Sequence, residues 1–208
     1  PGVELTLEAF TGYWRKVPTV KSLALRVIPD EATRLAALKR GEVDMAYSIT
    51  GALAEELKRT PGLTLKPTYM PFTSWLVPVD QWDPKSPWHD RRVRQAANLA
   101  IDRDGINQAA YLGLAKVTNS IIPSQMDYFW QPPAPRYDPA QAKKLLAEAG
   151  YANGFDAGEL GGDMIYGSAI GEPSANYLNA VGIRTPLRLM ERAAYYNDYG
   201  EKKLAGVL

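Results

Sequence analysis

Six tyrosine and tryptophan residues fall in segments that the sequence predicts to be loops or crossing strands. Each such side chain offers a broad apolar ring and one hydrogen-bonding group, which suits a ligand that is partly polar and partly apolar. Binding residues also concentrate on loops held by a rigid scaffold. We therefore predict ligand binding for these residues, with packing between domains as the alternative. They are Tyr69, Trp75, Trp82, Tyr128, Trp130 and Tyr166.

The same survey finds little that could perform covalent catalysis. The chain has no cysteine, and its one histidine is His89. His89 precedes Asp90, but adjacent side chains diverge, and no nucleophile accompanies them. Three aspartates are placed to cap helices rather than to act as a catalytic pair, and they lack the spacing of a calcium loop. We predict no enzymatic activity, no metal site and no cofactor; the three aspartates are Asp102, Asp104 and Asp138.

Two other patterns have structural explanations. Arg91, Arg92 and Arg94 stand together at a predicted helix start, where an anion site is one interpretation. Arginines there oppose the helix dipole, so we expect them to bridge to carboxylates instead. A glycine-rich stretch superficially resembles a phosphate loop, but no Gly-Lys-Ser/Thr follows it. Its glycines are Gly158, Gly161 and Gly162.

Composition limits the class of protein. The chain has 208 residues, 46% of them apolar and 23% charged, which is ordinary for one large or two small globular domains. Its formal net charge is +1 without basic runs, which argues against nucleic-acid binding. No apolar run approaches the roughly 18 residues of a membrane span.

The first third of the chain predicts alternating strands and helices. Residues 23–27 alternate apolar and polar side chains as a strand does, and Asp30 can cap the helix that follows. Short strands are expected at 43–47 and 63–65 around a helix at 52–58, a βαβ-type pattern that indicates an α/β architecture. Residues 66–87 are rich in proline and aromatic residues. They predict a domain boundary, with at most an edge or crossing strand near 74–79.

Helices dominate the rest of the chain. We expect them to begin at Asp90, Asp102 and Asp138, with others at 174–181 and from residue 191 and a strand at 184–190. The connection 117–136 is expected to be an ordered, functional loop or to pack across another lobe, rather than to be a simple linker. The final residues become apolar where a strand would begin, so we expect a piece of a longer chain. Four further tyrosines are expected in the core: Tyr47, Tyr111, Tyr151 and Tyr177.

Four segments of the chain carry a family resemblance. The first is VIPDEATRLAALKRGEVD at 27–44, and the second is PWHDRRVRQAANLAIDR at 87–103. The third is YDPAQAKKLLAEAGY at 137–151, and the fourth is ANYLNAVGI at 175–183. Together, and in this order, they resemble the family-5 extracellular solute-binding proteins of dipeptide, oligopeptide and nickel ABC importers.

The resemblance implies part of a two-lobed clamshell fold of the type II periplasmic binding proteins, with mixed sheets flanked by helices. Residues 1–70 resemble part of lobe I, and residues 71–208 resemble part of the lobe that closes over the ligand. The implied function is capture of a peptide or peptide-like solute by hinge closure for an ABC importer. The implied location is the periplasm or the extracellular face of the cytoplasmic membrane, and the implied partners are the solute and the permease subunits of the importer.

The chain also departs from the family. Dipeptide binders hold the ligand carboxylate with an arginine near the position of residues 166–172, and no arginine stands there. This departure favours a longer peptide or another solute over a simple dipeptide. One wall of a cleft alone predicts weak or absent ligand binding. Two alternatives remain open: an enzyme domain for a small metabolite, and a protein-interaction domain that self-associates through exposed apolar surface.

Overall fold

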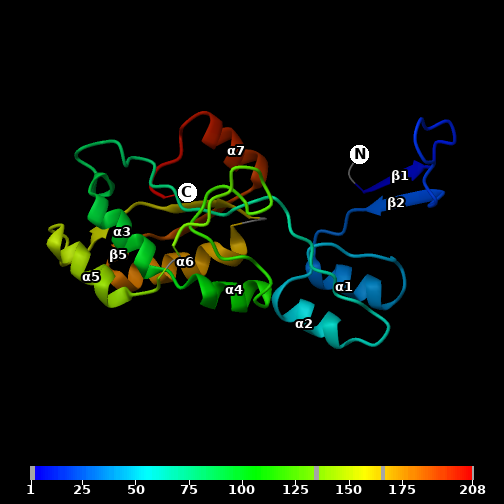
Figure 1. Ribbon diagram of the computed structural model, residues 1–208, viewed down its shortest axis with the longest axis horizontal. Helices are drawn as coiled ribbons and strands as arrows, with labels where there is room; N and C mark the ends of the chain where they lie inside the picture. Colours follow the sequence, from blue (N-terminus) through cyan, green and yellow to red (C-terminus); the bar gives the residue numbers. More distant parts are fainter. Residues whose placement is uncertain (1–2, 134–135, 165–166, 208) are drawn as a thin grey trace. The chain divides into compact units, whose positions relative to one another are not determined.

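The computed structural model describes residues 3–133, 136–164 and 167–207 and shows an α/β chain (Figure 1). Its short strands form both antiparallel and parallel pairs and alternate with helices, so the predicted combination of helices and mixed sheets is confirmed. The chain divides into two compact units: the first ends at Lys66 and the second begins at Pro67.

The first unit combines a hairpin with a pair of helices. Strand β1 (Glu4–Glu8) pairs antiparallel with β2 (Ser22–Arg26), and helices α1 (Glu31–Lys39) and α2 (Gly51–Arg59) follow. The carboxylate of Asp30 accepts a hydrogen bond of 2.7 Å from the Thr33 amide and so caps α1, as predicted. Among the described residues of this unit, the buried apolar side chains all come from the two helices: Leu35, Ala37, Ala54 and Leu57.

Two strands predicted for this unit do not form. Residues 43–47 and 63–65 pair with no strand, so the predicted βαβ pattern is wrong and an antiparallel hairpin takes its place. Arg34 accounts for the loop at 43–47, because its guanidinium donates hydrogen bonds to the carbonyl oxygens of Tyr47 at 3.1 Å and Ser48 at 2.9 Å. The same side chain also binds the carbonyl oxygens of Ile28 and Pro29. The segment is therefore held as a loop, and Tyr47 is exposed rather than in the core.

The second unit contains most of the helices. Those predicted from Asp90, Asp102, Asp138 and residue 191 are confirmed, whereas the helix expected at 174–181 begins earlier and includes Pro173. Their bounds are η1 (Pro87–His89), α3 (Arg91–Ala100), α4 (Arg103–Tyr111), α5 (Pro139–Glu148), α6 (Ser168–Val181) and α7 (Arg192–Gly200). None of the helices in the described part of the chain combines the length and apolar character that a membrane span requires.

Parallel strands run through this unit in two short ladders. Strand β3 (Phe155–Asp156) pairs with β5 (Ile183–Arg184), and further along β4 (Leu160–Asp163) pairs with β6 (Leu187–Met190). Val207 pairs in parallel with Leu160 and antiparallel with Pro78. A strand at the last residues and a crossing strand near Pro78 were predicted and are present as these single bridges. Strands β3 and β4 were not predicted, because glycines interrupt the apolar pattern there.

The core of the second unit lies between its helices and these strands. Figure 1 shows α3 and α5 side by side, and the indole of Trp88 meets the Phe155 ring edge-on at 5.6 Å. Of the tyrosines predicted to be core, Tyr151 and Tyr177 pack against it, and Tyr111 is half-buried. The largest fully buried side chains are Leu146, Leu178, Ile183, Val93, Val207 and Thr185.

Candidate functional site

The carboxyl ends of β4 and β6 meet at one edge of the sheet. Asp163, the last residue of β4, lies opposite Met190, the last residue of β6. The Met164 amide donates a hydrogen bond of 2.9 Å to the Met190 carbonyl and closes this edge. In open α/β sheets, ligands bind in the crevice beyond the carboxyl ends of the strands. This edge is therefore the candidate binding site.

A buried carboxylate and a tyrosine cluster occupy the edge. Asp163 is only 6% exposed, and the Tyr195 phenol lies within electrostatic reach of it. Burial raises the pKa of Tyr195, and the nearby Tyr196 and Asp163 raise this pKa further. The Tyr195 ring stacks on Tyr199 at 6.3 Å between centroids and meets Tyr196 edge-on at 5.3 Å. These groups can hold a polar ligand through hydroxyl, carboxylate and ring contacts.

The start of α7 fixes this cluster at the edge. The Glu191 carboxylate accepts hydrogen bonds from the amides of Ala193 at 2.9 Å and Ala194 at 3.1 Å. These two bonds lower the pKa of Glu191. The Arg192 guanidinium lies 5.5 Å from the centroid of the Tyr196 ring, which adds a cation–π contact. Helix α7 therefore presents a cation and aromatic rings directly after β6.

The crossing segment brings Trp75 to the same edge. Pro78 runs antiparallel to Val207, which runs parallel to Leu160, and Figure 1 shows residues 67–79 as an extended trace along the sheet. Extended residues advance about 3.3 Å each, so three residues back from Pro78 reach the level of Asp163, three residues beyond Leu160. From this spacing we expect Trp75 near the level of the carboxyl edge, and more than half of its surface is exposed.

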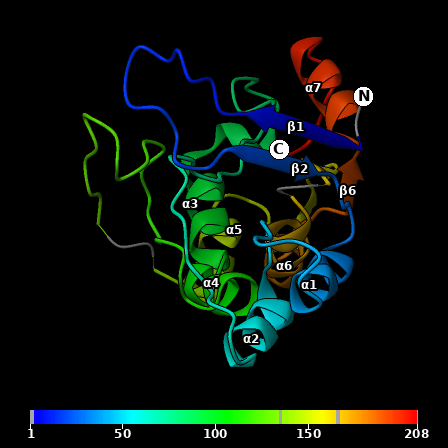
Figure 2. The same ribbon diagram turned by 90° about the vertical axis from the view of Figure 1, so that its right-hand side faces the viewer.

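The other predicted binding residues are distributed unevenly. Trp82 lies four residues past Pro78, within a turn, and is 83% exposed. Tyr69, also exposed, precedes Trp75 on the crossing segment. Tyr128 and Trp130 project from the loop 117–133, which lies away from β6 and α7 in Figure 2. Tyr166 lies outside the described residues.

The described part of the long loop, residues 117–133, has internal contacts. The Asn119 side chain donates a hydrogen bond of 2.9 Å to the Pro133 carbonyl, and the Lys116 ammonium lies 5.3 Å from the Phe129 ring centroid. Tyr128 has a positive φ of 65° and is 94% exposed. Such a backbone conformation is costly for a tyrosine, so the surrounding loop must stabilise it.

Sequence patterns did not identify Asp163, Arg192 or Tyr195. Only their position could have identified them, because each stands at or just after the carboxyl end of a parallel strand. The stretch Leu160–Asp163 was interpreted only as a weak phosphate-loop resemblance because it contains Gly161 and Gly162. Recognising β4 as a strand would have placed Asp163 at its carboxyl end.

Of the arginines at the start of α3, Arg92 bridges to a carboxylate as expected, whereas Arg94 binds carbonyl oxygens. The Arg92 side chain hydrogen-bonds both oxygens of the Asp90 carboxylate and donates a bond of 2.7 Å to the Glu148 carbonyl at the end of α5. The hydrogen bonds from Arg92 lower the pKa of Asp90. Arg94 binds the carbonyl oxygens of Trp88 and His89 at 2.6 and 2.8 Å. These side chains hold α3, α5 and η1 together.

The aspartates and the histidine have no catalytic arrangement. Asp102 and Asp138 cap helices α4 and α5 through the amides of Gly105 and Gln141, both at 2.9 Å. Asp104 lies within the first turn of α4 instead of capping it. One ring nitrogen of His89 lies 3.3 Å from the carbonyl oxygen of Gln81. Over the residues that the structure describes, no three His, Cys, Asp or Glu side chains come together as metal ligands.

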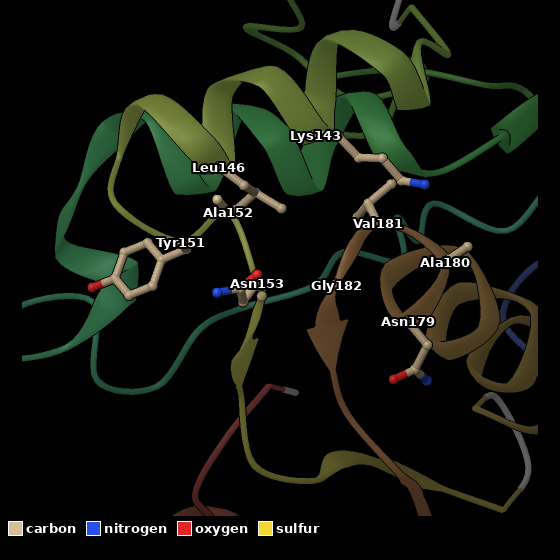
Figure 3. Close-up of a pocket in the computed structure, with 10 residues that line it drawn as sticks. Lys143, Leu146, Tyr151, Ala152, Asn153, Asn179, Ala180, Val181 and Gly182 are labelled. Carbon is tan, nitrogen blue, oxygen red and sulfur yellow. The ribbon is translucent and has the colours of Figure 1, made fainter.

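A surface pocket of about 360 Å³ lies at the other edge of the sheet (Figure 3). Lys143, Asn153 and Asn179 contribute its polar side chains, and Gly154 and Gly182 lie at the amino ends of β3 and β5. The C-terminal ends of α5 and α6 converge there. Because ligands favour the carboxyl ends of parallel strands, we do not place the binding site in this pocket.

Comparison with known proteins finds matches along nearly the whole chain. The family model described as bacterial extracellular solute-binding proteins, family 5 Middle, matches residues 1–206. The glutathione-binding protein GsiB of Escherichia coli K12 is 30% identical over 204 residues, which are 95% of this chain and 39% of that protein. GsiB of Pectobacterium atrosepticum is 35% identical over 151 residues, which are 72% of this chain and 29% of that protein.

Solved structures of binding proteins also match this chain. The periplasmic binding protein DppA of Helicobacter pylori, in complex with the peptide STSA, superposes with a TM-score of 0.82. It is 25% identical, and the match covers 99% of this chain and 39% of that one. AgaA of A. tumefaciens R10, in complex with agropinic acid, matches with a TM-score of 0.77 and 27% identity over 99% of this chain and 42% of that one. The chain spans about two fifths of the length of these proteins.

Proposed function

The chain belongs to the bacterial extracellular solute-binding proteins of family 5, and from this we propose that it serves as part of the substrate-binding component of an ABC importer. The solute would be a peptide or a peptide-like molecule, bound reversibly and released unchanged. Capture would follow hinge closure, in which the ligand bridges two lobes and favours the closed population. The unit ending at Lys66 would contribute to lobe I, and the unit beginning at Pro67 to the closing lobe.

The observation that carries this proposal is the convergence at the carboxyl edge of β4 and β6. We propose that the crossing segment, which bridges the sheet at Pro78, adds Trp75 to the Asp163 of β4 and the Tyr195 of α7. A peptide offers amide groups for hydroxyl and carboxylate partners and side chains for aromatic rings, so its chemistry matches this set. We place Tyr69, next along the crossing segment, on the same wall, and give Trp82, Tyr128 and Trp130 more peripheral positions.

Transport of this kind requires no covalent step. The family and the relatives are binding proteins, and the site residues named above can orient a ligand without a nucleophile and base in contact. We propose that the protein works outside the cytoplasmic membrane and delivers its solute to permease subunits. One wall of a cleft buries only part of a ligand, so we expect a Kd on the order of millimolar for this chain alone.

A pair of tryptophan variants tests the proposal. Trp75→Ala removes a ring at the carboxyl edge, whereas Trp82→Ala removes one from the turn after the crossing segment. We expect tripeptides, titrated at millimolar concentration and followed by amide chemical shifts, to bind wild type and Trp82→Ala alike. Binding to Trp75→Ala should be at least about fivefold weaker. Equal weakening by both substitutions, or by neither, would refute the proposed wall.

A further inference from the structure

Asn153 and Gly154 form the one asparagine–glycine pair of the chain. An asparagine side chain can cyclise when the backbone nitrogen of the next residue attacks its carbonyl carbon. A glycine in that next position leaves the nitrogen unshielded, because glycine has no β-carbon. The pair lies between α5 and β3, where Asn153 lines the pocket of Figure 3. It is therefore a candidate for spontaneous chemical modification.

The turn around this pair restrains the groups that would react. The Gly154 nitrogen donates its hydrogen to the Tyr151 carbonyl in a bond of 2.9 Å, so the proton that must leave before the attack is held. The Arg184 guanidinium donates a hydrogen bond of 3.1 Å to the Asn153 carbonyl oxygen. Gly154 also has a φ of +71° and packs against the backbone of Gly182. These contacts fix the backbone that must rotate before the nitrogen can reach the side chain.

We propose that Asn153 is a deamidation site, which this turn keeps inactive in the folded chain and which reacts when the start of β3 separates from β5. In the first step the Gly154 nitrogen loses its proton and bonds to Cγ of Asn153. The Cγ–Nδ2 bond breaks, and ammonia leaves with that proton. Water then opens the cyclic imide at one of its two carbonyl carbons, which gives aspartate or isoaspartate. The reaction needs no ligand, enzyme or redox partner, so it does not depend on which surfaces of the chain are free.

The modification changes both the charge and the backbone of this edge. Either product carries a carboxylate in place of a neutral amide, in the pocket that Lys143 also lines and next to the Arg184 guanidinium. Isoaspartate also routes the main chain through the former Asn153 side chain, which adds one methylene before Gly154. The approach of Gly154 to Gly182 has no room even for a β-carbon, so the longer backbone cannot keep this contact. The site therefore converts a transient opening of the β3–β5 ladder into a permanent change.

Ageing of the folded and the unfolded chain is the first test. The chain is incubated in buffer and in guanidinium chloride at the same pH and temperature, and peptide mapping by mass spectrometry measures the conversion of Asn153 from amide to acid. We expect conversion to be at least about tenfold slower in the folded chain, because only its opened population reacts. Equal rates under the two conditions, or no conversion in guanidinium chloride, would overturn the proposal.

A pair of arginine variants shows whether this turn provides the protection. Arg184→Gln removes the guanidinium that binds the Asn153 carbonyl, whereas Arg188→Gln, on β6, removes one that bonds to Glu159 at 3.0 Å. Arg184→Gln should speed conversion in the folded chain at least about threefold, and Arg188→Gln should leave it unchanged. In guanidinium chloride both variants should react at the wild-type rate.

Equal acceleration by the two arginine variants would show that global unfolding, and not this turn, exposes the pair, and would overturn the proposal. The ageing of the wild-type chain remains a test if either variant fails to fold. Both tests are made without ligand, so failure of the proposed transport function would not affect them.

Discussion

Gly154 and Gly182 pack backbone against backbone at the amino ends of β3 and β5, beside the pocket of Figure 3. A β-carbon on Gly154 would overlap the carbonyl oxygen of Gly182, and the backbone of Gly154 has a φ of +71°. The same Gly182 carbonyl accepts a hydrogen bond of 3.0 Å from the Phe155 amide, which starts the β3–β5 ladder. This contact therefore sets the distance between β3 and β5 at their amino ends.

The contact predicts a large difference between two glycine substitutions. Gly150 also has a positive φ, +93°, but nothing lies within 4 Å of the position of an added β-carbon. Gly150→Ala should cost about 1 kcal/mol of unfolding free energy, from backbone strain alone. Gly154→Ala should cost at least about 3 kcal/mol, because the two strands must also separate. Urea denaturation followed by circular dichroism measures both, and similar costs would contradict the close approach.

The α3–α5 core predicts a cavity effect. Leu146 is fully buried in this core, whereas Lys143, one turn earlier on α5, is exposed. Leu146→Ala should lower the unfolding free energy by about 2–5 kcal/mol. Lys143→Ala should change it by less than about 0.5 kcal/mol. The same urea experiment compares the two variants. A loss of unfolding free energy in Leu146→Ala as small as that in Lys143→Ala would show that this helix pair is not the core of the second unit.

Asp90 predicts a pH dependence. Its hydrogen bonds to Arg92 lower its pKa from an ordinary value of 3.8. A carboxyl group with a lowered pKa in the folded state contributes stability above its unfolded pKa, and this contribution is lost as the pH falls through the folded value. Asn caps a helix about as well as Asp, so Asp90→Asn isolates the charge. The variant should be less stable than wild type at pH 7 and nearly equal to it near pH 2.

The control for Asp90→Asn is Asp104→Asn, which removes the same charge from the first turn of α4. Thermal unfolding of both variants at pH 7 and near pH 2 gives the comparison. A stability gap between wild type and Asp90→Asn that does not narrow toward low pH would contradict the ion pair with Arg92.

Arg34 predicts local opening in the first unit. Its guanidinium reaches four carbonyl oxygens on two loops, which the single ammonium of a lysine cannot do. Arg34→Lys should therefore speed amide hydrogen exchange across residues 41–50 by about tenfold or more. Arg40→Lys, which alters an arginine that pairs with neighbouring Glu42, should leave that exchange unchanged. Equal effects of both substitutions would show that Arg34 does not hold the loop.

Local signals in the sequence were sufficient for four helices with an aspartate cap. Asp30, Asp90, Asp102 and Asp138 precede apolar stripes, and each caps the predicted helix because capping depends on residues two or three apart. The strand predictions failed where the pairing partner is distant in the sequence. Residues 43–47 have a strand-like pattern, but Arg34 binds the carbonyl oxygen of Tyr47 at the end of this segment. Strand β4 has a glycine-rich pattern yet forms because β6 pairs with it. The family resemblance, carried by four ordered segments, was confirmed.

The candidate site, like the fold, was predictable only where the signal is local in the sequence. Aromatic residues in loops drew attention to Trp75 because composition and proline content mark the crossing segment. Asp163, Arg192 and Tyr195 could not be found this way, because only the parallel pairing of β4 with β6 brings residues 29 positions apart to one edge. The register of a sheet is a property of two segments together, and neither segment encodes it alone.

The most direct test of the central claim is a map of where a peptide contacts this chain. Two-dimensional amide NMR spectra recorded during a tripeptide titration to about 10 mM, in the range expected for millimolar binding, supply that map. The account predicts shifts in fast exchange at residues 160–164 and 190–196 and at the Trp75 indole. Shifts that cluster around Gly154 and Gly182 instead would contradict it.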